Sequence, residues 1–381
     1  MTRVGPIDFE TVGETLRIHD EVMDTTCRIA ADDAMDVKQV SDARFLFPVD
    51  AAVSLEATTL SMPANSGSCV RDEEGDVERP LTESEAAFPR GTYYIEIEAN
   101  CKVYVKVFDA AFEVSFERHH GPDAVTVTFD DRTLVAIGAR SRHERPHETI
   151  TVPDDPGALL KALPFLGAAV KEWSPERSWP TLRGHPPRIE RGDDLSIPPA
   201  LSRPETGVTI ATPATYESLY AVAPLAYYLG ADMIEASEPE LRLDNGYRQS
   251  LGDEAVSTEE ATALLERCFF LDTLVRTAGY YDVPRQEYEA VAGALSFYPP
   301  AVYDEPIAEQ LMEYLEAPRS TFEGYVPRPR YTAALRDDPA DATLLPYLVR
   351  DLVPIAVGDD RAVSDRALVT GHSVPPIPEG D

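Results

Sequence analysis

The sequence predicts a mixed α+β protein: an antiparallel β-sandwich or small barrel, then an α/β domain with a short parallel sheet and several helices. Three observations support this. Apolar and polar residues alternate through residues 92–140, which is the period of half-buried strands. Prolines crowd residues 174–206, and beyond them apolar residues recur at helical spacing. A strand–helix–strand pattern at residues 207–236 indicates a parallel strand pair.

Residues 1–150 are expected to form the antiparallel β domain. Alternation is clearest where Ile95 and Ile97 flank Glu96, and it continues at Val103, Val105, Val107, Val125, Val127 and Phe129. We expect strand breaks at positions 100–101, 109–110, 121–122 and 130–131. Two further strands are predicted at 44–47 and 52–60, and the acid-rich residues 71–85 are expected to form an exposed loop. Short strands at this spacing are typical of a sandwich or small barrel.

Residues 151–206 are expected to hold a kinked helix and a linker. Asp155 is a candidate N-cap with Pro156 at the first helical position. Pro164 should kink or split the helix, because proline lacks the N–H that the helix needs. The proline density of residues 174–206 indicates an extended segment between two domains.

The second domain is predicted at residues 207–356. A short strand at 207–211 precedes a helix with Thr212 as N-cap and Pro213 at its first position, and Gly230 should end that helix. Ser257 and Glu260 form a capping-box pattern before another helix. Further helices are expected at 285–295, at 306–315, and at 343–352 with an interruption at Pro346. Residues 357–381 are expected to be an extended tail.

The charge of the chain is its most distinctive feature. Asp and Glu number 67 against 34 Lys and Arg, which gives a formal net charge of −33. Such a charge is destabilising in dilute buffer, and molar salt screens most of the repulsion. We interpret the dispersed acids over an ordinary hydrophobic core as those of a halophilic cytoplasmic protein, with a mesophilic acidic protein as the alternative.

The same features restrict the partners. An acidic surface without a run of Lys or Arg argues against binding to nucleic acid. The first residues lack the pattern of a secretory signal, and the sequence has no apolar stretch of the length that spans a bilayer. We therefore expect no nucleic-acid partner and no membrane association; a protein partner is compatible with these features.

No catalytic or metal-binding residue is predicted. The sequence lacks a GxSxG motif, and its four cysteines form no CxxC pair. His119 and His120 are neighbours on a predicted strand, so their rings should point to opposite faces. Pro146 lies between His143 and His147 and argues against the helix that would bring them together. No cofactor motif such as GxGxxG or GxxxxGKS is present.

One candidate ligand site remains, at the start of the predicted helix after residue 211. Thr212 and Thr215 lie at a helix N-terminus that follows a parallel strand, where backbone N–H groups can hold an anion. The competing interpretation is that a threonine before this helix is simply its N-cap.

Four segments of the second half carry a family resemblance: LYAVAPLAYYLGAD, CFFLDTLVRTAGYY, EQLMEYLEAP and LLPYLVRDL. They resemble a set of uncharacterised haloarchaeal proteins whose longer members continue into a CHAT-like segment, related to caspase-type cysteine peptidases. The resemblance covers residues 205–355 well and the β-rich half loosely. It implies that this chain is the front part of a larger protein. The His and Cys of a CHAT-type site have no counterpart here, so no catalytic residue is carried over.

Three functions are compatible with these observations. The first is a non-catalytic recognition or regulatory region joined to a peptidase-like effector. The second is a stand-alone hydrolase with an unrecognised site near Thr212 and Thr215. The third is a structural or assembly subunit that docks through its β domain.

Overall fold

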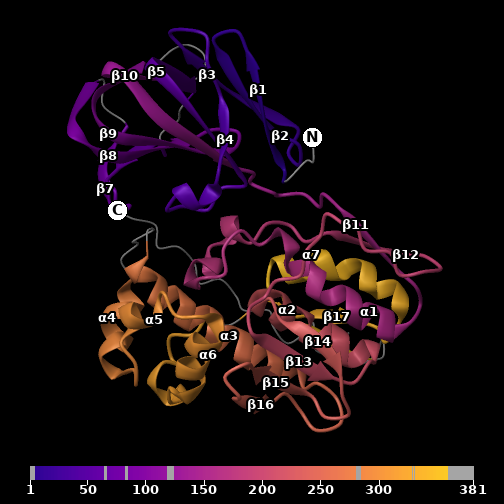
Figure 1. Cartoon of the computed structure of the whole chain (residues 1–381). Coiled ribbons are helices and arrows are strands. Elements are labelled where there is room, and N and C mark those ends of the chain that lie inside the picture. The colour runs from indigo at the N-terminus through magenta and orange to yellow at the C-terminus, as the bar shows by residue number, and fades with distance from the viewer. Residues whose placement is uncertain are drawn as a thin grey trace, which may run out of the picture. The chain divides into compact units, whose positions relative to one another are not determined.

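A computed structural model describes residues 5–63, 67–81, 85–117, 124–279, 285–327, 329 and 331–358. The chain divides into two compact units, which are described separately. The first comprises Met1–Arg145 with Arg276–Pro284, and the second comprises Pro146–Val275 with Arg285–Asp381. The first is built on a large antiparallel sheet and the second combines short sheets with helices, which confirms the predicted mixed α+β class (Figure 1).

The first unit contains a ten-stranded sheet in the order β1-β2-β3-β5-β10-β9-β8-β6-β7, with β4 paired to β5. All of its pairs are antiparallel. The bounds are β1 Ile7–Val12, β2 Thr15–Asp20, β3 Thr25–Ala31, β4 Lys38–Val40, β5 Ala51–Pro63, β6 Cys69–Arg71, β7 Val77–Pro80, β8 Glu85–Glu98, β9 Lys102–Glu117 and β10 Ala124–Arg140.

Two predicted strand breaks are wrong, because β9 and β10 are each continuous. Residues 109–110 and 130–131 lie inside these strands, where the pairing register shifts. Asp109 has a φ of 45°, and the Arg90 guanidinium of β8 donates to both of its carboxylate oxygens at 3.0 and 2.9 Å. An acidic residue with positive φ is typical of a turn, yet here it marks a bulge within a strand.

The sheet buries side chains on both of its faces. One face carries the main core of the unit, which includes Leu16, Val105 and Val127. The other is covered by residues 41–50, where Phe47 stacks on Tyr104 with ring centroids 4.7 Å apart. The strand predicted at 44–47 is therefore wrong: Asp42–Arg44 forms a 3-10 turn and Phe47 lies over the sheet.

Part of the expected loop at residues 71–85 belongs to the sheet. Strands β6 and β7 take up both sides of a turn at residues 72–76, where Asp72 accepts from the N–H groups of Gly75 and Asp76, both at 2.8 Å. Residues 82–84 of that prediction, like His119 and His120, lie outside the described part of the chain.

The second unit has a four-stranded sheet in the order β14-β13-β15-β16 and two parallel pairs, β11-β12 and β17-β18. Its strands are β11 Thr149–Val152, β12 Arg188–Arg191, β13 Val208–Thr212, β14 Asp232–Glu235, β15 Glu240–Leu243, β16 Arg248–Ser250, β17 Ala333–Leu335 and β18 Ile355–Val357. Its α-helices are α1 Pro156–Ala162, α2 Tyr216–Leu229, α3 Thr258–Val275, α4 Gln286–Val291, α5 Pro299–Val302, α6 Ile307–Glu316 and α7 Leu345–Arg350.

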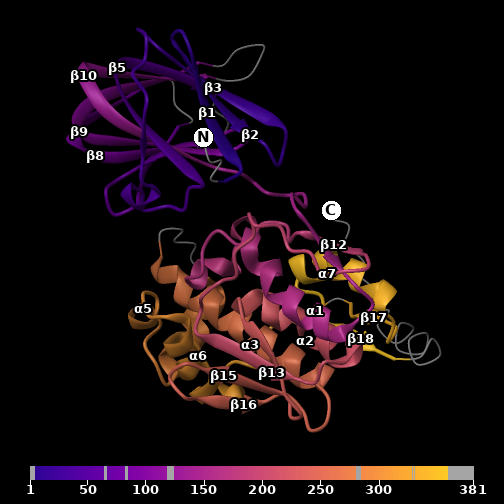
Figure 2. The same ribbon diagram turned by 45° about the vertical axis from the view of Figure 1, so that its right-hand side comes forward.

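The predicted strand–helix–strand unit is present. Strands β13 and β14 are parallel and α2 connects them, ending at Gly230 with a φ of 58°. Helix α2 is the centre of the unit, because every residue from Ser218 to Leu229 is buried and the helix contacts α1, α3, α7 and β18 (Figure 2). A helix that is buried all round needs apolar residues on every face, and α2 has them.

Several predicted helix boundaries need correction. The N-cap of α2 is Thr215, whose hydroxyl accepts from the Ser218 N–H, whereas Thr212 is the last residue of β13. Pro346 lies at the start of α7 rather than interrupting a longer helix, because the preceding residues Pro339–Leu344 form a 3-10 segment. The N-cap roles of Asp155 and Ser257 are confirmed by bonds from the Ala158 and Glu260 N–H groups.

The proline-rich segment is not a linker between the two units. Residues 146–206 belong to the second unit, where the predicted helix splits before Pro164 into α1 and the 3-10 segment Leu163–Ala169. Pro175–Ser178 and Pro180–Leu182 are further 3-10 turns that each begin with proline. Proline presets the φ of a first helical position, so these prolines initiate compact turns rather than an extended chain.

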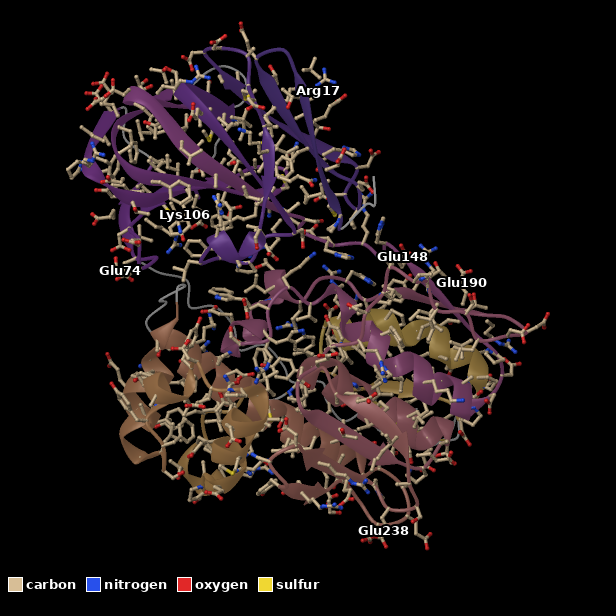
Figure 3. All side chains as sticks on the ribbon, viewed as in Figure 1. Arg17, Glu74, Lys106, Glu148, Glu190 and Glu238 are labelled. Carbon is tan, nitrogen blue, oxygen red and sulfur yellow. The ribbon has the colours of Figure 1, made fainter. Side chains whose placement is uncertain are left out.

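The acidic residues are distributed over the surfaces of both units. Glu74 in the first unit and Glu238 in the second are exposed and project from the ribbon (Figure 3). Among the described residues, no helix is long and apolar enough to cross a membrane. Residues 359–381 of the predicted tail lie outside the described part of the chain, and Val357 belongs to β18.

Candidate functional site

The turn after β13 brings Thr212 and Thr215 close in sequence but gives them different surroundings. Thr212 is fully buried, and its hydroxyl lies 3.4 Å from the Pro213 carbonyl oxygen. The Thr215 hydroxyl accepts from the Ser218 N–H at 3.3 Å and so occupies one of the free donors at the start of α2. These contacts match the N-cap interpretation of Thr215.

A cavity of about 180 Å³ lies elsewhere in the second unit, between strand β16 and helix α3; we call it the β16–α3 pocket. Three segments line it: the strand and the residue after it, one face of α3, and the region where α6 ends. Its lining residues are Gln249, Ser250, Leu251, Glu260, Ala263, Leu264, Arg267, Leu315 and Arg319.

Helix α3 supplies the largest share of this lining. Glu260, Ala263, Leu264 and Arg267 follow one another at intervals of three, one and three residues, which places them along one stripe of the helix. Strand β16 is the last in its sheet and pairs only with β15 in the described part of the chain, so the pocket lies at a sheet edge.

Arg267 is held in place by the end of α6. Its Nε donates to the Tyr314 carbonyl at 2.7 Å, and its Nη2 donates to the carbonyls of Leu315, at 2.9 Å, and Ala317. The guanidinium carbon lies 5.6 Å from the centre of the Phe322 ring. Helix C-termini leave carbonyl oxygens without partners, and this arginine caps them. The Nη1 has no hydrogen-bond acceptor among the described residues.

The second arginine of the pocket is more exposed. The side chain of Arg319 is 58% exposed, and its Nε lies 4.0 Å from a Glu323 carboxylate oxygen. Burial, and to a smaller extent the positive charge of Arg319, lower the pKa of the Arg267 guanidinium. An arginine remains charged through such a shift, so the pocket presents two cations that repel each other.

A second polar cluster of this unit is completely buried. Arg177 and Asp272 form an ion pair at 2.8 Å, and both side chains are 0% exposed. The hydroxyls of Tyr228 and Tyr314 donate to the Asp272 carboxylate at 2.5 and 2.9 Å. Burial raises the pKa of the Asp272 carboxyl to about 6, against the lowering effect of Arg177. Because no solvent reaches these groups, we assign the cluster to stability.

The first unit has a related network beside its aromatic face. Glu96 pairs with Arg71 and Lys102, and all three side chains are at most 12% exposed. Burial alone would raise the pKa of the Glu96 carboxyl, but Lys102 and Arg71 outweigh it and lower that pKa. The carboxylate is thus an anionic anchor between β6, β8 and β9.

Within the described part of the chain, no contact joins a cysteine thiol to a histidine ring, although the Cys27 and Cys101 thiols hydrogen-bond to each other, which lowers the pKa of Cys27. All four cysteines are buried, and burial raises the pKa of the Cys69 and Cys268 thiols to about 12. His143 lies in the segment after β10, and His185 is buried with its Nδ1 2.8 Å from the Pro186 carbonyl oxygen. Within the described residues, no three His, Cys, Asp or Glu side chains gather as a metal site requires.

Sequence reasoning did not find the pocket. Glu260 and Arg267 are seven residues apart on a predicted helix, so their shared stripe could have been anticipated. The contributions of Gln249 and Arg319 could not, because they come from segments that only the tertiary fold brings together. Comparison with protein-family models, curated proteins and solved structures finds no match to this chain.

Proposed function

We propose that this chain is a non-catalytic recognition or regulatory region of a halophilic cytoplasmic protein, joined in the native polypeptide to a peptidase-like effector. The observation that carries the recognition role is the chemistry of the β16–α3 pocket. Its described lining combines guanidinium groups, amide and hydroxyl groups and aliphatic side chains, without a nucleophile supported by a base. Such a lining is suited to holding a charged group rather than to breaking a bond.

The alternative of a stand-alone hydrolase has weaker support. Ser250 lines the pocket, but its hydroxyl donates to the Gly252 carbonyl at 3.0 Å, and no histidine is among the described lining residues. The four thiols are buried, where a cysteine is inert. Thr212 is fully buried, and the Thr215 hydroxyl caps α2. Neither threonine is therefore placed to act as a nucleophile.

Two assays test the proposal. The purified protein, kept in molar KCl, is incubated with fluorogenic peptides and esters, and we expect no turnover above a heat-inactivated control. An immunoblot of native cells with an antibody against residues 207–356 tests the link to an effector. A product clearly longer than 381 residues supports that link. A product of the present length contradicts it.

A further inference from the structure

We propose that the β16–α3 pocket binds a small amino carboxylate, whose carboxylate lies against Arg267 and Arg319 and whose ammonium group lies against Glu260. The inference rests on the proposed recognition function and names the ligand class for that role. It follows from the charges that line the pocket, the fixed position of one arginine, and the size and polarity of the space between them.

The two arginines are unusual in a chain with twice as many acids as bases. Asp and Glu number 67 against 34 Lys and Arg, and exposed arginines such as Arg191 and Arg90 pair closely with aspartates. By contrast, the described residues place no carboxylate within 3.5 Å of the Arg267 or Arg319 guanidinium; the nearest contact is the 4.0 Å approach of Glu323. A pocket with two guanidinium groups, neither of which makes a close carboxylate pair, is suited to an anion.

Arg267 is preorganised for this role. Three carbonyl oxygens at the end of α6 hold its Nε and Nη2, and the Phe322 ring packs against the guanidinium. A side chain that is already fixed loses little rotamer freedom when it binds a ligand. Its Nη1 keeps its hydrogen-bonding capacity, and the more exposed Arg319 can complete a two-arginine clamp on a carboxylate.

The pocket is partly open to solvent, and the space within it fits a small ligand. A volume of about 180 Å³ corresponds to roughly six water molecules at ~30 Å³ each, well below the ~300 Å³ at which drug-sized sites begin. Ala263, Leu264 and Leu315 line it with aliphatic surface. A short methylene chain fits this apolar middle, since burying it removes apolar surface from water.

Glu260 determines the charge of the group at the other end of the ligand. It lies seven residues before Arg267 on α3, about 10 Å along the helix axis. Its carboxylate disfavours a second negative charge, which argues against phosphate, and favours an ammonium group. The Gln249 amide beside it adds a hydrogen-bonding group. Opposite charges at the two ends of an apolar space match an amino carboxylate.

Isothermal titration calorimetry in buffered KCl tests the site with three probes: 5-aminopentanoate, pentanoate and inorganic phosphate. We expect the wild-type protein to bind 5-aminopentanoate most tightly. Arg319→Gln should weaken binding about tenfold or more, as the loss of a charge-assisted hydrogen bond does. Glu260→Gln should remove the preference for 5-aminopentanoate over pentanoate. Both substitutions leave the capping bonds of Arg267 intact.

Arg248→Gln is the matched control. Arg248 lies on β16 with a side chain 63% exposed and outside the pocket lining, so its loss removes the same charge from the same region. Binding by this variant should stay within about twofold of wild type, since charges that do not contact the ligand contribute little in salt. Thermal unfolding of each variant verifies that it is folded.

Three results overturn the inference: no binding of 5-aminopentanoate at millimolar concentration, tighter binding of phosphate, or equal weakening by Arg248→Gln and Arg319→Gln. These outcomes reject the ligand class or the site but leave a recognition role through another surface intact. Turnover of peptides or esters rejects the recognition function itself, so the two failures are distinguishable.

Discussion

The buried ion pair of Arg177 and Asp272 gives the sharpest prediction for stability. Replacing Arg177 with methionine removes the cation while keeping an unbranched side chain in the same space. Asp272 then remains 0% exposed with only the Tyr228 and Tyr314 hydroxyls as described donors. Removing one partner of a buried pair typically costs about 3–5 kcal/mol, because the other charge stays buried without compensation. The Trp173 and Gln310 oxygens also lose their donor.

The pH dependence of the stability lost in Arg177→Met identifies Asp272 as the group responsible. Burial already raises the pKa of Asp272 to about 6, above its value in an unfolded chain, and Arg177 opposes that rise. Without Arg177 the folded pKa rises further. A carboxyl with a raised pKa contributes stability that is present below the unfolded pKa and lost as the pH rises through the folded pKa. The difference in the free energy of unfolding between wild type and Arg177→Met should therefore increase above about pH 6, by up to ~1.4 kcal/mol per pH unit.

Urea unfolding in molar KCl, followed by far-ultraviolet circular dichroism at pH 5 and pH 8, measures both effects. Molar salt leaves a buried pair almost unscreened. Arg191→Met is the matched control, because Arg191 also binds an aspartate but its side chain is 48% exposed; we expect it to lose far less stability than Arg177→Met. Equal losses of stability in the two variants, or a difference between wild type and Arg177→Met that does not change with pH, would show that Asp272 does not depend on Arg177 for its charge.

Three further predictions follow from the same structure. Lowering KCl from molar to about 0.1 M lengthens the Debye length from about 3 to about 10 Å, so the thermal unfolding temperature should fall; an unchanged temperature contradicts a halophilic surface. Thr215→Ala should lower the free energy of unfolding by about 1 kcal/mol through loss of the α2 cap, measured by urea unfolding, and Thr215→Ser should restore most of it. The four buried cysteines should react with a thiol reagent at neutral pH only after unfolding, and rapid labelling of the native protein would show that a thiol is accessible.

The sequence-level prediction succeeded where local pattern and tertiary environment agree. Alternation at Ile95 and Ile97 located β8, and the apolar run before Tyr216 with Gly230 after it located the parallel strand–helix–strand unit. At β8 the alternation of the chain directly reports which side chains face the main core, whereas the strand–helix–strand unit was located by an apolar run and by the residues that bound the helix. The fold class could therefore be predicted before any coordinates were known.

The wrong predictions come from residues whose usual local preference is overridden by their tertiary contacts. Asp109 has the character of a turn residue, but its ion pair with Arg90 stabilises a bulge inside a long strand. Pro175 and Pro180 suggested an extended linker, but each begins a 3-10 turn in the second unit. The β16–α3 pocket was missed for a different reason, since Gln249 and Arg319 meet α3 only through tertiary packing.

We propose that this chain recognises a ligand and does not transform it, and one measurement tests both parts of this proposal. Proton NMR of a pool of amino acids and dipeptides, incubated with the folded protein in molar KCl, reports both properties in one measurement. We expect selective broadening of amino-carboxylate resonances, which is lost in Arg319→Gln, with no new resonances over time. New resonances from cleaved dipeptides, dependent on the folded protein, would contradict it.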